Sequence, residues 1–407
     1  MIGYFAARPG SPVGLFRLML WAQTGVGTFL ASQVPMALLL AKRKWLLLNQ
    51  RRMALPFLNR FRRRRDQVVA VDLGSKVSKA VQLSGTDGNY AIDSFATLDV
   101  PGDNPAHYVD IFADHVREIV ARMGSRCRQL CVAISVNDSL LRQAEMPMVP
   151  LHDMRTMLRF SSKNYLQQDL SDCVFDCHIL PPKGGGGEGD GRKVAGKCRV
   201  LVGASKRQLV ADLEAGAKKA GMQLVHVAPN FVGPPNAFER SQPEQFKEEA
   251  VALIELGQKN TAITVLDRGE LALNRVVNYG SERLTQGIAD ALGISEDEAE
   301  GAKLTMPPDV ESYLSALLMP LGRELRASID FFDHQHDRAV SQAYFSGGSA
   351  RSSKIIENLQ VEMMVPCSQW DPLSSMQIKL PPEQLGEVEQ FAPQLAVAVG
   401  AGLAALD

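Results

Sequence analysis

A segment near residue 70 combines the residue types that bind phosphate. Apolar residues run into Asp72-Leu73-Gly74-Ser75 and a second apolar run follows, which predicts two strands joined at a glycine bend. Glycine lets the backbone approach a ligand closely, and the amides around the bend can form an anion-binding nest. Lys79 and Lys76 would add charged donors to a phosphate, and Asp72 would hold Mg²⁺ through water. Ordinary hairpins share this pattern, so it predicts a nucleotide site only together with further signals.

The same plan returns about 180 residues later in the chain. Glu255 stands two positions before Gly257, again between two apolar runs, and residues 258–261 fill the turn. Farther on, the apolar run 343–345 is followed by Ser346 and then by Gly347-Gly348-Ser349. Two glycine hairpins and a later glycine pair, in this order, resemble the actin-like nucleotide-binding fold.

The resemblance to the actin-like fold implies which residues contact a nucleotide. In that fold the two hairpins clamp the phosphates from both sides, and the glycine pair lets adenosine lie against bare backbone. The nucleotide-binding residues expected here are Asp72, Gly74, Ser75, Lys76, Ser78, Lys79, Gly257, Gln258, Asn260, Thr261, Gly347, Gly348 and Ser349. Asp72 and Glu255 are expected to hold Mg²⁺ through water. No residue stands out as the group that would position an attacking water, so no catalytic residue is predicted.

The composition is that of a globular protein with two domains. The chain has 407 residues, of which 45% are hydrophobic and 22% charged, and this length suffices for two cores. The 44 basic residues nearly balance the 45 acidic ones, so the chain as a whole is not built to attract nucleic acid. Six cysteines in a chain this long do not indicate a disulfide framework. Buried thiols in a reducing cytoplasm explain them better than a zinc site, because the Cys127/Cys131 and Cys173/Cys177 pairs lack zinc-knuckle spacing.

Residues 1–65 differ from the rest and are expected to form a leader that is poorly ordered or associated with a membrane. Residues 18–41 carry no charge and would be long enough to span a bilayer, but polar residues and glycines within them weaken that interpretation. Met53 resembles a natural start, so residues 1–52 are expected to be an over-extended start or a poorly ordered tail, with a membrane anchor as the alternative. Residues 55–65, from Leu55 to Arg65, combine apolar and basic side chains. They would either rest on an anionic membrane surface or remain a solvated basic leader.

Apolar periodicity divides the remainder into the strands and helices of an α/β protein. Strands are expected from 68 and at 78–83, 90–98, 130–135, 141–146, 174–180, 198–203 and 223–227, and helices at 108–123, 152–167, 206–220, 282–292, 314–334 and 393–406. Ser295-Glu296-Asp297-Glu298 is a capping box that opens a further helix. We expect a first lobe at 66–250, a subdomain inserted into it at about 140–226, and a second lobe at 251–407 whose last helix returns to the first lobe.

Six short segments, in this order, resemble the PilM family of type IV pilus assembly proteins, which is itself similar to the division protein FtsA. They are VDLGSKVSKAV (71–81), AEMP (144–147), LVGASK (201–206), GIADALG (287–293), RELRASIDFF (323–332) and FSGGSA (345–350). The likeness covers about residues 66–406, and the segment 323–332 is fairly specific. The chain departs from the family in two places. Glu255 stands where aspartate is usual, and the segment 160–168 lacks the Glu-Ala and Pro-Phe pairs usual in the docking-groove helix.

The resemblance implies a duplicated, ribonuclease H-like α/β fold of actin-like type, with two lobes that bind ATP and Mg²⁺ between them and an inserted FtsA-type subdomain. In the family, the cytoplasmic tail of the membrane protein PilN docks in a groove between the first lobe and the inserted subdomain. Pilus motor ATPases are further candidate partners. The implied function is an ATP-binding scaffold of a type IV pilus or type II secretion platform, cytoplasmic and peripheral to the bacterial inner membrane. ATP hydrolysis is expected to be slow or absent.

Two other functions fit the same fold. An FtsA-like cell-division or filament-forming protein normally ends in an amphipathic membrane helix, whereas residues 393–406 are rich in small apolar residues. A small-molecule kinase would need an aspartate base that faces a substrate pocket, and no Gly-x-Asp element stands out after the second hairpin. Both functions stay open as alternatives to the pilus scaffold.

Overall fold

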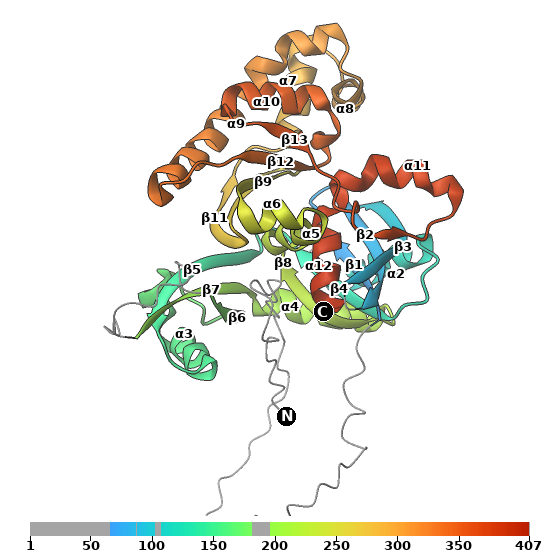
Figure 1. The fold of residues 1–407 in the computed structure, drawn as a ribbon. Coiled ribbons are helices and arrows are strands. Elements are labelled where there is room, and N and C mark those ends of the chain that lie inside the picture. Colours follow the sequence, from blue (N-terminus) through green and yellow to red (C-terminus); the bar gives the residue numbers. More distant parts are fainter. Residues whose placement is uncertain (1–65, 87, 102–106, 181–195, 407) are drawn as a thin grey trace, which may run out of the picture.

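The computed structural model describes residues 66–86, 88–101, 107–180 and 196–406. Within them the strands form three separate sheets, of six, five and three strands (Figure 1). The predicted leader, including its basic segment 55–65, lies outside the described residues. Among the helices that are described, none is both long enough and apolar enough to cross a bilayer.

The first large sheet has the strand order β14-β3-β2-β1-β4-β8, and the second has the order β11-β10-β9-β12-β13. The strands of the first sheet are β1 (Gln67–Asp72), β2 (Val77–Thr86), β3 (Asn89–Asp99), β4 (Gln129–Ile134), β8 (Gln223–Pro229) and β14 (Gln377–Ile378). The strands of the second sheet are β9 (Ala250–Leu256), β10 (Thr261–Asp267), β11 (Glu270–Val277), β12 (Gln342–Gly347) and β13 (Cys367–Gln369).

Both large sheets follow one plan. In the first sheet, β1 pairs antiparallel with β2 and parallel with β4. In the second sheet, β9 pairs antiparallel with β10 and parallel with β12. The two glycine hairpins predicted from the sequence therefore occupy equivalent places in the two sheets, each with its first strand in the interior of the sheet.

Helices cover the outer faces of both sheets and also fill the space between them. The first sheet carries α2 (Tyr108–Arg122) and α4 (Arg207–Lys219) on its outer face. The second sheet carries α7 (Ser281–Leu292), α9 (Pro308–His336) and α10 (Ser353–Met363). The remaining helices are α3 (Leu151–Leu166), α5 (Gly233–Ser241), α6 (Pro243–Glu248), α8 (Glu296–Thr305), α11 (Pro382–Phe391) and α12 (Ala396–Leu406), with 3-10 turns η3 (Asn230–Val232), η4 (Ser349–Arg351) and η5 (Ala392–Leu395).

A central layer made of α5, α12 and η3 lies between the two large sheets (Figure 1). Ala70 of β1 and Leu253 of β9 pack in one hydrophobic cluster with residues of α12, whereas Val71 of β1 and Ile254 of β9 belong to the outer clusters. Successive side chains of a strand point to opposite faces. Even-numbered residues of β1 and odd-numbered residues of β9 therefore face the central layer.

The last helix packs against α5 with almost no space between the two backbones. Every residue of α12 is buried, and a Cβ atom added to Gly400 would lie 1.8 Å from the Gly233 carbonyl oxygen of α5. The side-chain amide of Asn236 also donates a hydrogen bond of 3.3 Å to the Gly400 carbonyl oxygen. The small residues of this segment thus allow a chain that has left the second sheet to pack on β1 and β2 of the first.

The third sheet, with the order β5-β7-β6, forms a unit with its own hydrophobic cluster and with helix α3. Its strands are β5 (Ser139–Pro147), β6 (Cys173–Ile179) and β7 (Lys197–Lys206). The predicted insertion at about 140–226 also included α4 and β8, but β8 pairs with β4 in the first sheet and α4 packs beside α2. We therefore propose that the inserted unit comprises residues 139–206.

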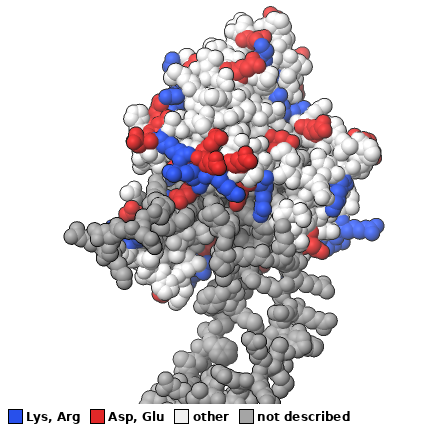
Figure 2. All heavy atoms as spheres, viewed as in Figure 1, with Lys and Arg blue, Asp and Glu red and all other residues white. Residues whose placement is uncertain are grey.

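Charges of both signs are interspersed on the face shown in Figure 2, near α6 and the lower end of β11. Arg338, for example, forms a 3.0 Å ion pair with Asp267 and also donates a hydrogen bond to the Glu248 carbonyl oxygen. This mixture agrees with the near balance of basic and acidic residues in the sequence.

Candidate functional site

The first hairpin presents an ion pair to the central layer. Asp72 ends β1, and only 2% of its surface is exposed. Lys79 is its antiparallel partner on β2, and Lys79 Nζ lies 3.3 Å from Asp72 Oδ2. Asp72 is an even-numbered residue of β1, so the strand alternation places this pair on the side of α12 and of the second lobe.

Glu255 of the second hairpin lies close enough to this ion pair to interact with its charges. It is an odd-numbered residue of β9 and therefore also faces the central layer. The charges of Asp72 and Lys79 both act on the Glu255 carboxyl group, which also accepts a hydrogen bond from the side chain of Asn230 in η3. The two hairpins, although they belong to different sheets, thus bring three ionisable groups into one space.

The pKa values of Glu255 and Lys79 reflect this crowding. Burial raises the pKa of Glu255 most, and the charge of Asp72 raises it further. Lys79 and Asn230 lower it, and the resulting pKa is about 7. Burial by itself would lower the pKa of Lys79, but the charges of Asp72 and Glu255 outweigh burial, and that pKa is raised. One cation therefore faces two carboxyl groups, and a second cation would be needed to neutralise both of them.

Each hairpin turns at a glycine that no larger residue could replace without movement. A Cβ atom on Gly74 would lie 2.2 Å from the Val77 carbonyl oxygen, and one on Gly257 would lie 2.7 Å from the Asn260 carbonyl oxygen. Real Cβ atoms do not approach backbone oxygens so closely. Both turns thus require glycine for their own backbone geometry, and at Gly74 the Lys79 Nζ atom also lies 3.1 Å from the added Cβ position.

Two of the predicted phosphate ligands point away from this space. Ser78 is fully buried on the opposite face of β2, where its Oγ lies 2.9 Å from His115 Nε2 of α2. Thr261 is fully buried too, and its hydroxyl donates a hydrogen bond of 2.7 Å to the Tyr279 carbonyl oxygen. Both side chains have partners in the hydrophobic interior, so we leave them out of the proposed nucleotide site.

The remaining turn residues lie at the surface of the hairpins. Ser75 and Lys76 are exposed at the first bend. At the second bend, Gln258 and Asn260 are half-buried, and Gln258 Oε1 accepts a hydrogen bond of 2.9 Å from Ser281 Oγ at the start of α7. The second bend is therefore fixed to the N-terminal end of α7.

The glycine pair lies beside the second hairpin, as β12 pairs with β9. Gly347 has φ +98°, and a Cβ atom there would lie 2.3 Å from the Leu256 carbonyl oxygen. Gly348 is half-buried, with space for a Cβ atom near the side chain of Gln394. The Ser349 hydroxyl is buried and has no hydrogen-bond partner within the described part of the chain. An unpartnered buried hydroxyl is costly, and a ligand that lies against this turn would satisfy it.

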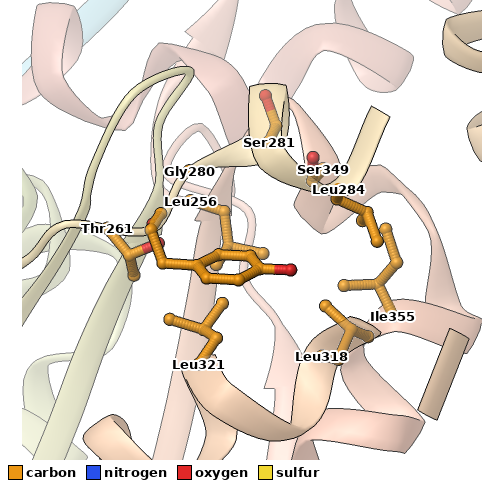
Figure 3. Close-up of a pocket in the computed structure, with 10 residues that line it drawn as sticks. Leu256, Thr261, Gly280, Ser281, Leu284, Leu318, Leu321, Ser349 and Ile355 are labelled. Atoms are coloured by element: carbon orange, nitrogen blue, oxygen red, sulfur yellow. The ribbon is translucent and has the colours of Figure 1, made fainter. Parts of the chain in front are cut away.

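A small cavity lies next to Ser349 (Figure 3). Its volume is ≈ 10 Å³ and its lining includes Leu284, Leu318, Ile355 and the ring of Tyr279. This volume holds one water molecule at most. The cavity is therefore a packing gap beside the turn and is too small for a nucleotide.

A polar cluster in the second lobe was missed by the sequence analysis. Lys303 of α8 is only 2% exposed, and its Nζ donates hydrogen bonds of 2.8 Å to Glu300 and 3.0 Å to Thr285 of α7. Burial lowers the pKa of Lys303, although Glu300 opposes the shift. The charge of Lys76 acts on both Glu300 and Lys303, so the cluster lies near the first hairpin.

Two lobes with equivalent hairpins that converge on one charged site, joined by a shared central layer, define an actin-like ATPase fold, as the sequence predicted. The model of the family described as type IV pilus assembly protein PilM matches residues 70–406. The chain belongs to this family.

Solved structures of low sequence identity share the architecture. The structure of a PilM-PilN type IV pilus biogenesis complex matches with a TM-score of 0.71 and 22% identity, over 84% of this chain and 99% of that chain. The ethanolamine utilization protein EutJ from Carboxydothermus hydrogenoformans matches with a TM-score of 0.44 and 17% identity, over 82% of this chain and 88% of that one. The first match bears on the fold alone, and the second is too distant to carry an argument.

Proposed function

We propose that this protein binds Mg·ATP between its two hairpins and acts as a scaffold in the inner-membrane platform of a type IV pilus. The observation that carries the nucleotide proposal is the meeting of Asp72, Lys79 and Glu255 from two different sheets. The phosphates would lie against the Gly74 and Gly257 turns and take Lys79 as a charged donor. The adenosine would lie between the Gly347-Gly348 turn and the cluster of Lys303, Glu300 and Thr285.

The residues between the hairpins suit Mg²⁺. Carboxylate oxygens are hard ligands, and Mg²⁺ commonly keeps several waters and takes one or two carboxylates together with phosphate oxygens. Asp72 and Glu255 would hold the ion through these waters. When bound, the ion would neutralise charge on the phosphates. Lys79 would then be free to turn from Asp72 to a phosphate oxygen.

The partner that we propose is the cytoplasmic tail of a PilN-like membrane protein. The support is membership of the PilM family and the likeness to a solved PilM-PilN complex. The tail would dock beside the inserted unit, where Met148 and Phe160 are 66% and 80% exposed. Binding of this tail would place the protein in the cytoplasm, at the inner face of the membrane.

Hydrolysis of ATP is proposed to be slow or absent, because no side chain in the described site is placed with clear geometry to position an attacking water. Calorimetric titration with ATP and Mg²⁺ tests the nucleotide proposal, and phosphate release over hours tests turnover. Titration with a synthetic peptide of the PilN-like tail encoded in the same genome tests the partner. Failure to bind ATP would remove the first proposal, and failure to bind the peptide would remove the second.

A further inference from the structure

Strand β11 connects the second lobe to the inserted unit through three polar contacts. The Arg199 guanidinium of β7 donates a hydrogen bond of 2.5 Å to Glu270 Oε2 at the start of β11. The side-chain amide of Asn274 in β11 donates a hydrogen bond of 3.3 Å to the Leu141 carbonyl oxygen of β5. The side-chain amide of Gln143 in β5 donates to the Leu271 carbonyl oxygen.

These contacts lie beside an apolar centre, and the Arg199–Glu270 pair is partly shielded from water, whereas Gln143 is exposed. Leu141, Leu201 and Leu271 are at most 2% exposed and belong to one hydrophobic cluster. The side chains of Arg199 and Glu270 are only 20% and 22% exposed. Such a pair is screened less by salt than an ion pair at the surface. The interface is therefore a packed contact, and we call it the β11 bridge.

The other end of β11 leads directly to the second nucleotide hairpin. After β11 the chain passes Gly280, where an added Cβ atom would lie 2.2 Å from the Gln258 carbonyl oxygen. The Ser281 amide then donates a hydrogen bond of 2.9 Å to the Gly257 carbonyl oxygen. Strand β11 is also the edge strand of its sheet, so its free edge can meet β5. One strand of roughly 25 Å thus contacts the inserted unit through residues 270–274 and leads at its C-terminal end to the hairpin.

We propose that the β11 bridge couples the nucleotide site to the inserted unit, so that ATP binding changes how the inserted unit sits and how well it holds its partner. The inference rests on the proposed binding of ATP between the lobes. The inserted unit is covalently joined to the first lobe, whereas the bridge joins it to the second. Closure of the lobes about ATP must therefore move the inserted unit with β11 or strain the bridge. In either case the two sites share a coupling free energy.

Hydrogen exchange of the full chain, with and without ATP and Mg²⁺, tests the coupling. In the wild type, ATP should slow exchange at both hairpins and also change exchange in β5 and β7. Glu270→Lys removes the ion pair of the β11 bridge. The ATP-induced change in exchange of β5 and β7 should then be at least twofold smaller than in the wild type. Protection of the hairpins by ATP should stay within twofold of the wild-type value. The charge exchange Arg199→Glu with Glu270→Arg should restore at least half of the lost change. Asn274→Ala, which alters no charge, gives a second test if Glu270→Lys folds poorly.

Glu324→Lys is the matched control, because Glu324 pairs at 2.5 Å with Arg275 of the same strand but within the second lobe. It should respond to ATP as the wild type does. Two results would overturn the coupling and leave ATP binding intact. The first is a wild type in which ATP protects the hairpins but does not change hydrogen exchange in β5 and β7. The second is an ATP-induced change in β5 and β7 that is as large in Glu270→Lys and Asn274→Ala as in the wild type. No protection at the hairpins of the wild type would overturn both.

Discussion

Asp72 and Glu255 stand at equivalent positions of two different sheets, each two residues before the glycine of its hairpin. The charge of Asp72 contributes to the raised pKa of Glu255, and Lys79 opposes that contribution. The carboxyl groups are therefore close enough to interact, although 183 positions separate them in the chain. A site of this kind exists only while the two lobes face each other.

Lys79→Met should weaken ATP binding by about 10–100-fold. The charge of Lys79 acts on both carboxyl groups, and a hydrogen bond to a charged group contributes about 1.5–3 kcal/mol. Calorimetric titration with Mg·ATP measures the change in affinity. Lys219→Met is the control, because Lys219 forms a 2.5 Å ion pair with Asp110 that is half-exposed on the outer helices. Equal affinities for the wild type and Lys79→Met would contradict the assignment of Lys79.

The free energy of unfolding should depend on the ionisation of Glu255 in the absence of nucleotide and metal. Its pKa rises from an ordinary 4.5 to about 7 on folding. Between these values the folded state binds more protons than the unfolded state, so the contribution of Glu255 is present at low pH and is lost as the pH rises toward 7. Relative to Glu255→Gln, the wild type should lose roughly 2 kcal/mol between pH 5 and pH 8.

Urea unfolding of both proteins across this pH range measures the difference. The amide group that replaces the carboxyl group in Glu255→Gln cannot ionise, so subtraction removes the contributions of groups that the two proteins share. Parallel curves for the two proteins would show that Glu255 has an ordinary pKa and that the carboxyl groups do not interact.

Without nucleotide, Ser349→Ala should stabilise the protein by about 1 kcal/mol or more, because the buried hydroxyl has no partner in the described residues. ATP affinity should nevertheless fall about 2–10-fold, as one neutral hydrogen bond contributes about 0.5–1.5 kcal/mol. The same titration measures it, with thermal unfolding as the check on stability. An unchanged affinity would place the nucleotide away from the glycine pair.

Gly400→Ala should destabilise the protein by about 3 kcal/mol, the upper range for overpacking. The added methyl group would lie 1.8 Å from the Gly233 carbonyl oxygen, and α5 and α12 would have to separate. Gly301→Ala in α8 is the matched control, because nothing lies within 4 Å of its Cβ position, and alanine should stabilise that helix by up to about 1 kcal/mol. The midpoints of urea unfolding measure the stability of both variants against the wild type. Similar effects of the two substitutions would contradict the close packing of α12.

The sequence allowed the hairpins and most strands to be predicted, because glycine bends between apolar runs are local signals. It also placed Asp72, Lys79 and Glu255 in one site through the repeat of the pattern. Ser78 was included because it lies within the hairpin, although strand alternation puts it on the face opposite Lys79. That periodicity was available in the sequence.

Other features could not be derived from local patterns. Lys303 lies in a helix opened by an acidic capping box, where a lysine is ordinarily solvent-exposed. Its burial depends on the packing of α8 against α7, which no local pattern specifies. The extent of the inserted unit depends on the pairing of β8 with β4, a contact between strands about 90 residues apart in sequence. The β11 bridge likewise joins segments that are distant in the chain.

The central claim is that Mg·ATP binds between the Gly74 and Gly257 turns. A crystal structure with a non-hydrolysable ATP analogue and Mg²⁺ tests it most directly. The expected result has the phosphates between the two turns, Lys79 Nζ on a phosphate oxygen, and the ion next to Asp72 and Glu255. A nucleotide bound elsewhere would contradict the claim. So would a structure at saturating nucleotide in which Lys79 is still paired with Asp72 and nothing lies between the turns.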